Sequence, residues 1–140
     1  MIGEAHHYGV TVSDMDTALE FYRDVLDLTL SDRFEIGGEA FDRFVGVDGT
    51  DVEIAFLDGG GCAVELLEYR EPSGGDANED VSNNDIGAAH FCFEVEDIDM
   101  AYDQVADAAE TLSEPQTLES GARVVYVKDP DGNVVEFLEP

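Results

Sequence analysis

Basic side chains are the scarcest feature of this chain. Its 140 residues contain 6 Lys and Arg against 34 Asp and Glu, and the formal net charge is −28. Binding to nucleic acid or to an anionic membrane surface needs clusters of Lys and Arg, so we expect neither partner. A large acidic surplus is typical of cytoplasmic proteins of salt-loving organisms, because molar salt screens the repulsion between like charges within a few ångströms.

Long apolar runs and cysteine frameworks are also missing. No stretch approaches the ~20 apolar residues that cross a bilayer, and the start MIGEAHHYGV lacks the basic and apolar regions of a secretory signal. Cys62 and Cys92 are too few for a disulfide framework, and we expect two small buried residues. Since 44% of the chain is hydrophobic, with 8 Phe and 5 Tyr, it can build a core. These features predict a soluble, cytoplasmic, folded domain.

A first block of sequence occurs twice. HYGVTVSDMDTA, residues 7–18, and HFCFEVEDIDMA, residues 90–101, both begin with His and an aromatic residue. Both then reach Val-x-Asp-(Met/Ile)-Asp at the same spacing, and both end on Ala. The match indicates a repeated structural unit.

A second block repeats in the same order. DGGGCAVELLEY, residues 58–69, aligns without a gap to DPDGNVVEFLEP, residues 129–140. The polar stretch 71–87 between the copies is rich in Gly, Asn, Asp and Ser, which favours a linker. We therefore predict one domain over 1–140, built from a module at 1–70, a linker at 71–87 and a second module at 88–140.

Each module is predicted to have the order βαβββ, which gives an α+β fold. In the first module the patterns favour a strand at 7–12, a helix from Met15 through Leu26 capped by Ser13 or Asp14, a strand at 28–36, and a hairpin of 51–57 with 62–69. In the second they favour a strand at 90–95, a helix at 97–108, a short strand near Thr117, and a hairpin of 124–128 with 133–138 around the turn Asp129–Gly132.

Alternation along the strands predicts one apolar face per module, covered by the helix, and a second face that carries chemistry. That second face holds His7 and Glu65 in the first module and His90 and Glu136 in the second. A single strand Glu in so acidic a chain is usually solvated, but here both the His and the Glu fall at matching repeat positions. Imidazole nitrogen and carboxylate oxygen suit a first-row divalent metal. We expect His6 to point to the opposite face and not to be a ligand.

These segments resemble the vicinal oxygen chelate superfamily, which includes glyoxalase I, methylmalonyl-CoA epimerase, extradiol dioxygenases and bleomycin resistance proteins. HYGVTVSDMDTALEFYRDVLDLTL, VELLEY, AAHFCFEVEDID and DPDGNVVEFLEP carry the resemblance. It implies tandem βαβββ modules whose mixed sheets curl into a cup. It also implies one divalent ion (Zn, Ni, Co, Mn or Fe) held by four ligands, which would be His7, Glu65, His90 and Glu136.

The resemblance implies a small substrate that chelates the metal through adjacent oxygens, and a lyase or isomerase reaction like that of glyoxalase I or methylmalonyl-CoA epimerase. Glu136 is the candidate for moving a proton, with Glu65 on the opposite side. The alternatives are an Fe(II) ring-cleaving dioxygenase and a non-catalytic resistance-type protein that sequesters its ligand. We also expect a homodimer, and the length of 71–87 permits a site within one chain or shared between two.

Overall fold

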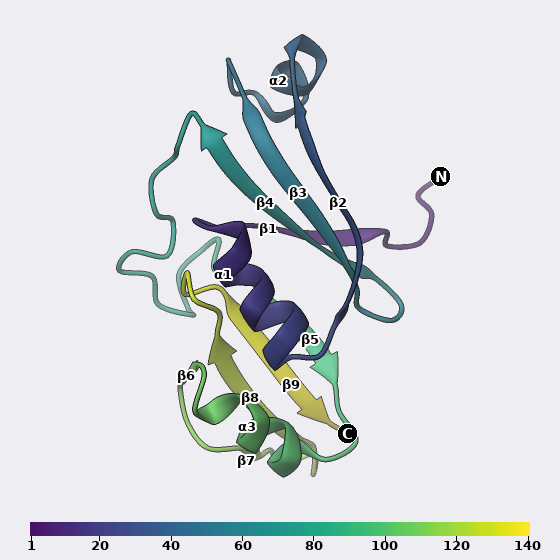
Figure 1. Ribbon diagram of the computed structural model, residues 1–140. Helices are drawn as coiled ribbons and strands as arrows, with labels where there is room; N and C mark the ends of the chain where they lie inside the picture. The colour runs from purple at the N-terminus through teal and green to yellow at the C-terminus, as the bar shows by residue number, and fades with distance from the viewer. The chain divides into compact units, whose positions relative to one another are not determined.

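The computed structural model describes residues 1–140, which divide into two compact units, Met1–Asp76 (unit 1) and Ala77–Pro140 (unit 2). The boundary lies inside the segment predicted as a linker. Each unit contains one mixed sheet with few helices, so the α+β prediction is confirmed (Figure 1). No helix has the length and apolar character needed to cross a membrane.

Unit 1 is built on a four-stranded sheet in the order β1-β4-β3-β2. Its strands are β1 (His7–Thr11), β2 (Thr29–Gly37), β3 (Asp51–Asp58) and β4 (Ala63–Glu71). β1 runs parallel to β4, whereas β4 with β3 and β3 with β2 are antiparallel. Because β1 and β4 are adjacent, the first and last strands of the unit can present side chains together on one face.

One face of this sheet, the helix face of unit 1, is covered by α1 (Met15–Leu19), which continues into the π-helical segment η1 (Glu20–Val25). Asp14 caps α1 by accepting from the Thr17 amide, which selects it over Ser13. Met15 and Leu19 are buried together with Val64 and Leu66 of β4. The predicted amphipathic helix and its apolar face are therefore confirmed, while the π-helical turn carried no separate sequence signal.

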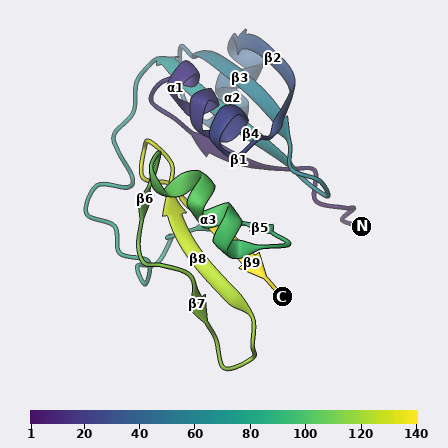
Figure 2. The ribbon, with the colours of Figure 1, turned by 60° about the horizontal axis from the view of Figure 1, so that its bottom comes forward.

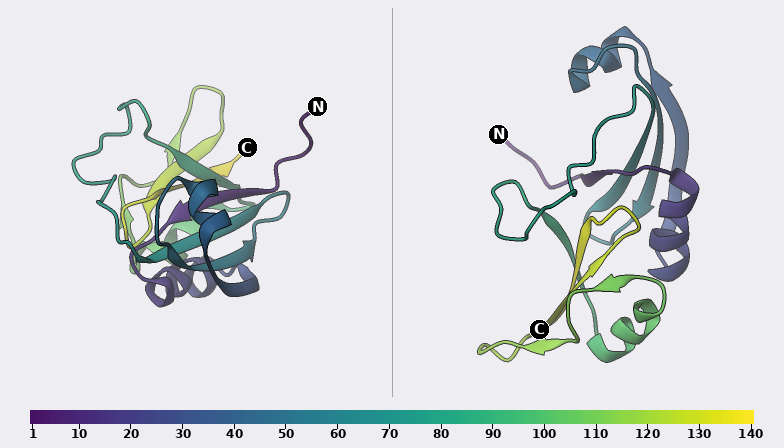
Figure 3. Two further views of the ribbon diagram at one scale, coloured as in Figure 1. Left: turned by 90° about the horizontal axis from the view of Figure 1, so that it is seen from above. Right: turned by 90° about the vertical axis from the view of Figure 1, so that its left-hand side faces the viewer.

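A helix that the sequence did not predict, α2 (Glu39–Val45), joins β2 to β3. It ends at Gly46 in the left-handed conformation with φ 71°, which glycine adopts at low cost. Phe41 packs with Val52 and Ile54 of β3. In the right-hand view of Figure 3, α1 and α2 lie on opposite sides of the sheet, so α2 covers part of the face that α1 leaves open.

Unit 2 repeats this plan with a five-stranded sheet. Its strands are β5 (His90–Glu94), β6 (Glu110–Thr111), β7 (Gln116–Thr117), β8 (Arg123–Lys128) and β9 (Val134–Glu139). β5 runs parallel to β9, and β8 pairs antiparallel with β9, β6 and β7. The single short strand predicted near Thr117 is thus β7, and β6 is an additional short strand that pairs with the other end of β8.

The helix face of unit 2 is covered by α3 (Ile98–Ala106), seen against β8 and β9 in Figure 2. Asp97 caps α3 by accepting from the Met100 amide. Ile98 and Val105 are buried with Val127 and Val135. The prediction that both cysteines are buried is wrong, because Cys62 is half-buried and Cys92 is exposed; Cys92 occupies the face opposite α3.

Candidate metal centre

In unit 1, His7 and Glu65 meet on the face opposite α1, which we call the site face of unit 1. β1 and β4 pair so that Gly9 lies beside Glu65, and His7 precedes Gly9 by one alternation on the same face. His7 Nε2 lies 3.0 Å from Glu65 Oε2. The side chains are 38% and 14% exposed, so the imidazole is accessible while the carboxylate is largely covered.

In unit 2, His90 and Glu136 form the same arrangement on the site face of unit 2, opposite α3. Cys92 lies beside Glu136 in the parallel pairing of β5 and β9. His90 Nε2 lies 2.9 Å from Glu136 Oε2, and the side chains are 42% and 17% exposed. The repeat therefore reproduces strand register, distance and exposure, and not only residue type.

The surroundings of His7 contain a residue that sequence reasoning misplaced. His6 Nδ1 lies 2.7 Å from His7 Nδ1, and the two rings meet edge to face with centroids 5.0 Å apart. The prediction that His6 points to the opposite face is wrong, because β1 begins only at His7 and strand alternation does not extend to His6. With Nε2 facing Glu65 and Nδ1 facing His6, both ring nitrogens of His7 have a partner.

Tyr126 is the side chain beside His90 that sequence reasoning missed. It lies opposite Glu136 in the β8–β9 pairing, and its hydroxyl is 3.2 Å from His90 Nδ1 and 3.5 Å from Nε2. Desolvation by burial, followed by the charge of Glu136, raises the pKa of Tyr126, so the phenol keeps its proton. The clue was its place ten residues before Glu136 in the strand of the final hairpin.

The hairpin that carries Glu136 is tied down at its turn. The buried Asp129 carboxylate accepts from the amides of Asp131 and Asn133, each at 2.9 Å, and from Asn133 Nδ2 at 2.8 Å. Gly132 has φ 82°, a value that the tight turn requires. Asn78 adds bonds to the Asp131 carbonyl and to Asn133 Oδ1. The well-held hairpin expected from the Asp129–Gly132 sequence is present.

The donor chemistry of both pairs fits a divalent metal. Two adjacent ligands of an octahedral ion at ~2.0–2.2 Å lie about 3 Å apart, which matches the 3.0 and 2.9 Å between Nε2 and Oε2 in the two pairs. The same spacing also suits a hydrogen bond. Each unit brings two candidate ligand side chains together, and no group of three or more His, Cys, Asp or Glu that could hold a metal occurs in the structure.

Comparison with known proteins decides the family. The model of the Glyoxalase/Bleomycin resistance protein/Dioxygenase superfamily matches residues 4–137. The chain belongs to this superfamily. The vicinal oxygen chelate resemblance is thereby confirmed over nearly the whole chain.

Relatives in this superfamily include enzymes of two kinds. The chain is 31% identical to a 2-epi-5-epi-valiolone epimerase of Actinomyces sp., covering 95% of this chain and 77% of that protein. It is 30% identical to a probable lactoylglutathione lyase of Synechocystis sp., covering 95% and 92%. Among solved structures, a glyoxalase family protein from Bacillus cereus shares 25% identity with a TM-score of 0.88, covering 99% of this chain and 95% of that one.

Proposed function

We propose that this superfamily member is a metal-dependent lyase or isomerase whose single divalent ion is held by His7, Glu65, His90 and Glu136. The observation that carries the proposal is the repeated His–Glu pair, with the same register and nearly the same Nε2–Oε2 distance in both units. The names of the relatives, an epimerase and a lyase, support an isomerising or eliminating reaction. Glyoxalase-type members of the superfamily typically use a divalent metal.

The donor set restricts the ion to first-row metals such as Zn, Ni, Co, Mn or Fe. Such an ion, when bound, would act as a Lewis acid toward a small substrate with two adjacent oxygens. Four protein ligands of an octahedral set leave room for these oxygens. The half-exposed imidazoles of His7 and His90 leave the ligand atoms accessible from solvent.

Glu136 is our candidate for the proton shuttle. Its carboxylate is largely covered, and its strand is held by the Asp129 turn, so the group can move without displacing the backbone. A carboxylate that alternates between holding a ligand position and taking a proton from the adjacent carbon suits an isomerase. Glu65 is placed equivalently in unit 1 and is the alternative base.

Replacing Glu136 with Gln tests this role, because the amide keeps the size and one oxygen donor but cannot accept the proton. We expect metal content to persist while turnover falls by ~10² or more, the scale of general-base loss. Glu94→Gln is the matched control, since Glu94 is exposed at the end of β5, on the same face as Cys92, and pairs with Leu138 instead of Glu136. Elemental analysis gives the metal content, and anaerobic assays on hemithioacetals of uncharged thiols give the turnover.

A Glu136→Gln protein with normal metal content and near-normal turnover would transfer the proton-moving role to Glu65. Activity that requires both iron and O₂ would replace the lyase or isomerase proposal with a ring-cleaving dioxygenase. Tight binding of a compound with no turnover under any condition would favour the sequestering protein.

We also propose that the chain forms a homodimer. The ligand set is divided evenly, with one His–Glu pair in each unit, so either one chain or an exchange between two chains can supply four ligands. Light scattering in molar KCl should give twice the chain mass of 15.2 kDa. A monomer that binds one metal equivalent would remove both the dimer and the exchange.

A further inference from the structure

The site face of unit 1 is apolar next to the His–Glu pair. The Phe56 ring meets His7 edge to face with centroids 5.5 Å apart, and Phe34 stacks on Phe56 at 6.2 Å with an interplanar angle of 22°. Ile54 is buried between Phe34 and Leu67 in the strand register, and Leu67 continues the surface along β4. A substrate bound at His7 and Glu65 would therefore have aromatic carbon beside it.

This apolar surface continues away from His7 as far as α2. Tyr69 of β4 and Val45 of α2 pack against the cluster formed by Phe41, Val52 and Ile54. None of these side chains carries a charge, and desolvation by burial raises the pKa of Tyr69. Beyond His7, the surface reaching to α2 thus offers contact to apolar groups, with the Tyr69 hydroxyl as a neutral donor and no cationic side chain among these residues.

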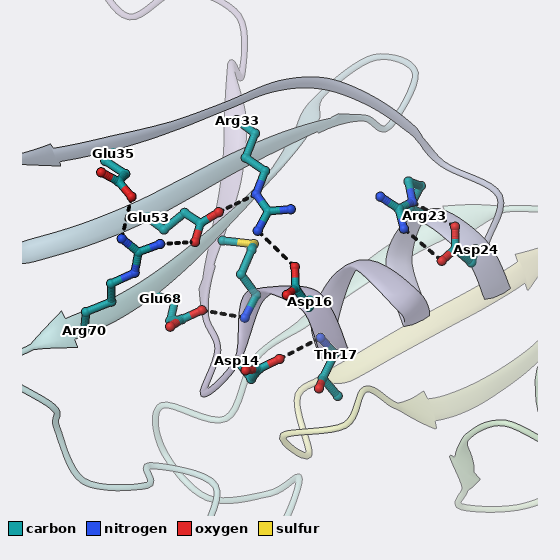
Figure 4. Close-up of polar contacts among 11 residues, drawn as sticks. Asp14, Asp16, Thr17, Arg23, Asp24, Arg33, Glu35, Glu53, Glu68 and Arg70 are labelled. Atoms are coloured by element: carbon teal, nitrogen blue, oxygen red, sulfur yellow. Dashed lines mark hydrogen bonds and ion pairs between the residues drawn. The ribbon is translucent and has the colours of Figure 1, made fainter.

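The two arginines of this sheet lie on its other face, the helix face of unit 1. Arg33 and Arg70 both bind the buried carboxylate of Glu53, and Arg33 also binds Asp16 of α1 at 3.0 Å. Figure 4 shows both guanidinium groups gathered around Glu53 beside α1. Glu53 pairs across the strands with Glu68, whose carboxylate accepts from the first amide of α1. Both guanidinium groups therefore lie on the helix face.

The other four cations of the chain also have carboxylate partners. Arg23 binds Asp24, Arg43 binds Glu39, and Arg123 binds Asp99 at the start of α3. Lys128 shares the site face of unit 2 with Tyr126, and its ammonium group binds Glu110 at 3.0 Å. A substrate anion would have to share one of these cations with its carboxylate partner, in a chain of net charge −28.

Taking the proposed metal function as given, we propose that the substrate is uncharged and has an apolar ring or alkyl part that packs on Phe56 and Phe34. Its adjacent oxygens face the His–Glu ligands. Substrates carried on anionic groups, including phosphorylated and carboxylated thiol conjugates, are poor ligands. Placing an unpaired carboxylate against this surface costs desolvation that no cation repays.

Three hydroxamic acids test the inference. All of them chelate a metal through the same two adjacent oxygens, and they differ only in the group attached to the carbonyl carbon. We choose acetohydroxamic, benzohydroxamic and 4-carboxybenzohydroxamic acid, titrated by calorimetry into the Co²⁺-loaded full chain in molar KCl. High salt removes most long-range repulsion and leaves the local effect of the surface. Benzohydroxamic acid should bind at least ~10-fold more tightly than the other two, the scale of one buried ring.

Variants then locate the effect. Phe56→Ala should abolish the ~10-fold preference for the benzo over the aceto compound while the aceto compound binds as before, which also shows that the ligands are intact. Phe44→Ala is the control, since Phe44 is 82% exposed on α2. Lys128→Gln should change none of the three affinities.

The possible outcomes distinguish a failure of the uncharged-substrate inference from a failure of the proposed metal function. A carboxylated probe that binds as tightly as benzohydroxamic acid, or that weakens on Lys128→Gln, overturns the uncharged-substrate inference and leaves the metal function standing. A benzo preference that survives Phe56→Ala also overturns it. If none of the three binds the Co²⁺-loaded protein, the metal function itself fails.

Discussion

Units 1 and 2 agree at their His–Glu pairs and differ in what surrounds those pairs. The residue opposite the glutamate on the neighbouring strand is Phe56 in unit 1 and Tyr126 in unit 2. The residue beside it on the first strand is Gly9 in unit 1 and Cys92 in unit 2. A Cβ at Gly9 would lie 3.2 Å from Glu65 Oε2, so that position leaves the carboxylate room that Cys92 does not. The repeat thus preserves the His–Glu pair and varies the side chains around it.

The units also differ in how much apolar material they bury. Thirteen of the buried apolar side chains lie in unit 1 and six in unit 2. Four of the six basic residues, including both that bind Glu53, are in unit 1. Unit 2 therefore has the smaller core and fewer ion pairs, and we expect its local stability to be the lower of the two.

The largest expected effect comes from removing either imidazole. His7→Ala and His90→Ala should each weaken metal binding by more than ~100-fold, because each removes one of four proposed ligands. His6→Ala, which removes only the partner of His7 Nδ1, should weaken it by ~10-fold. Competition with a chelator measures all three. If one imidazole can be removed at no cost in affinity, the two pairs do not share one ion.

The next largest effect is expected from salt, which should change the stability of the chain and reveal a difference in stability between the two units. The chain has 34 acidic residues and only 6 basic ones, so its like charges repel one another. Because molar KCl screens this repulsion, it should raise the thermal midpoint by at least ~5 °C over dilute buffer. Amide exchange in dilute buffer should lose protection in β8 and β9 before β3 and β4, since unit 2 has the smaller core. A midpoint independent of salt would reject the halophile interpretation, and uniform exchange would contradict the difference in core size.

The repeat explains which features the sequence could predict. The matching spacing of the repeat identifies His7 as equivalent to His90, and Glu65 as equivalent to Glu136. Strand alternation then predicts on which face of the sheet each side chain lies, without knowledge of tertiary packing. The Asp129–Gly132 turn was predictable for the same reason, since its chemistry is local.

The features that were missed depend on contacts between distant segments or on weak local signals. α2 has only seven residues and depends on Phe41 packing against β3. His6 lies just outside β1, where alternation no longer predicts direction. Tyr126 gains its meaning only from the β8–β9 register that sets it opposite Glu136.

The repeat also gave matching glutamates at residues 68 and 139, and the structure shows what they do. Glu68 accepts from the Met15 amide at 2.6 Å, and Glu139 accepts from the Ile98 amide at 2.8 Å, so each binds the first amide of its unit's helix. Glu68→Gln and Glu139→Gln should each lower the free energy of unfolding by about 1 kcal/mol, measured by urea denaturation in molar KCl.

The two losses should add, because the glutamates belong to different units. Glu71→Gln, at the exposed end of β4, is the control and should change the free energy by less than ~0.5 kcal/mol. A loss at Glu68 with none at Glu139 would show that the capping role differs between the units.

The smallest expected effect tests the Phe56–Tyr126 difference directly. Tyr126→Phe should weaken metal binding only ~3-fold, because its hydroxyl lies 3.2 and 3.5 Å from the His90 nitrogens, at the long end for a hydrogen bond. Phe56→Tyr should not strengthen binding at His7, since both nitrogens of that ring already have partners in His6 and Glu65. Chelator competition on the two single variants and on the exchanged pair resolves these differences. Phe56→Tyr could instead raise the metal affinity by as much as Tyr126→Phe lowers it. That result would show that a tyrosine hydroxyl acts alike in both units, and that His6 is not the equivalent in unit 1 of Tyr126 in unit 2.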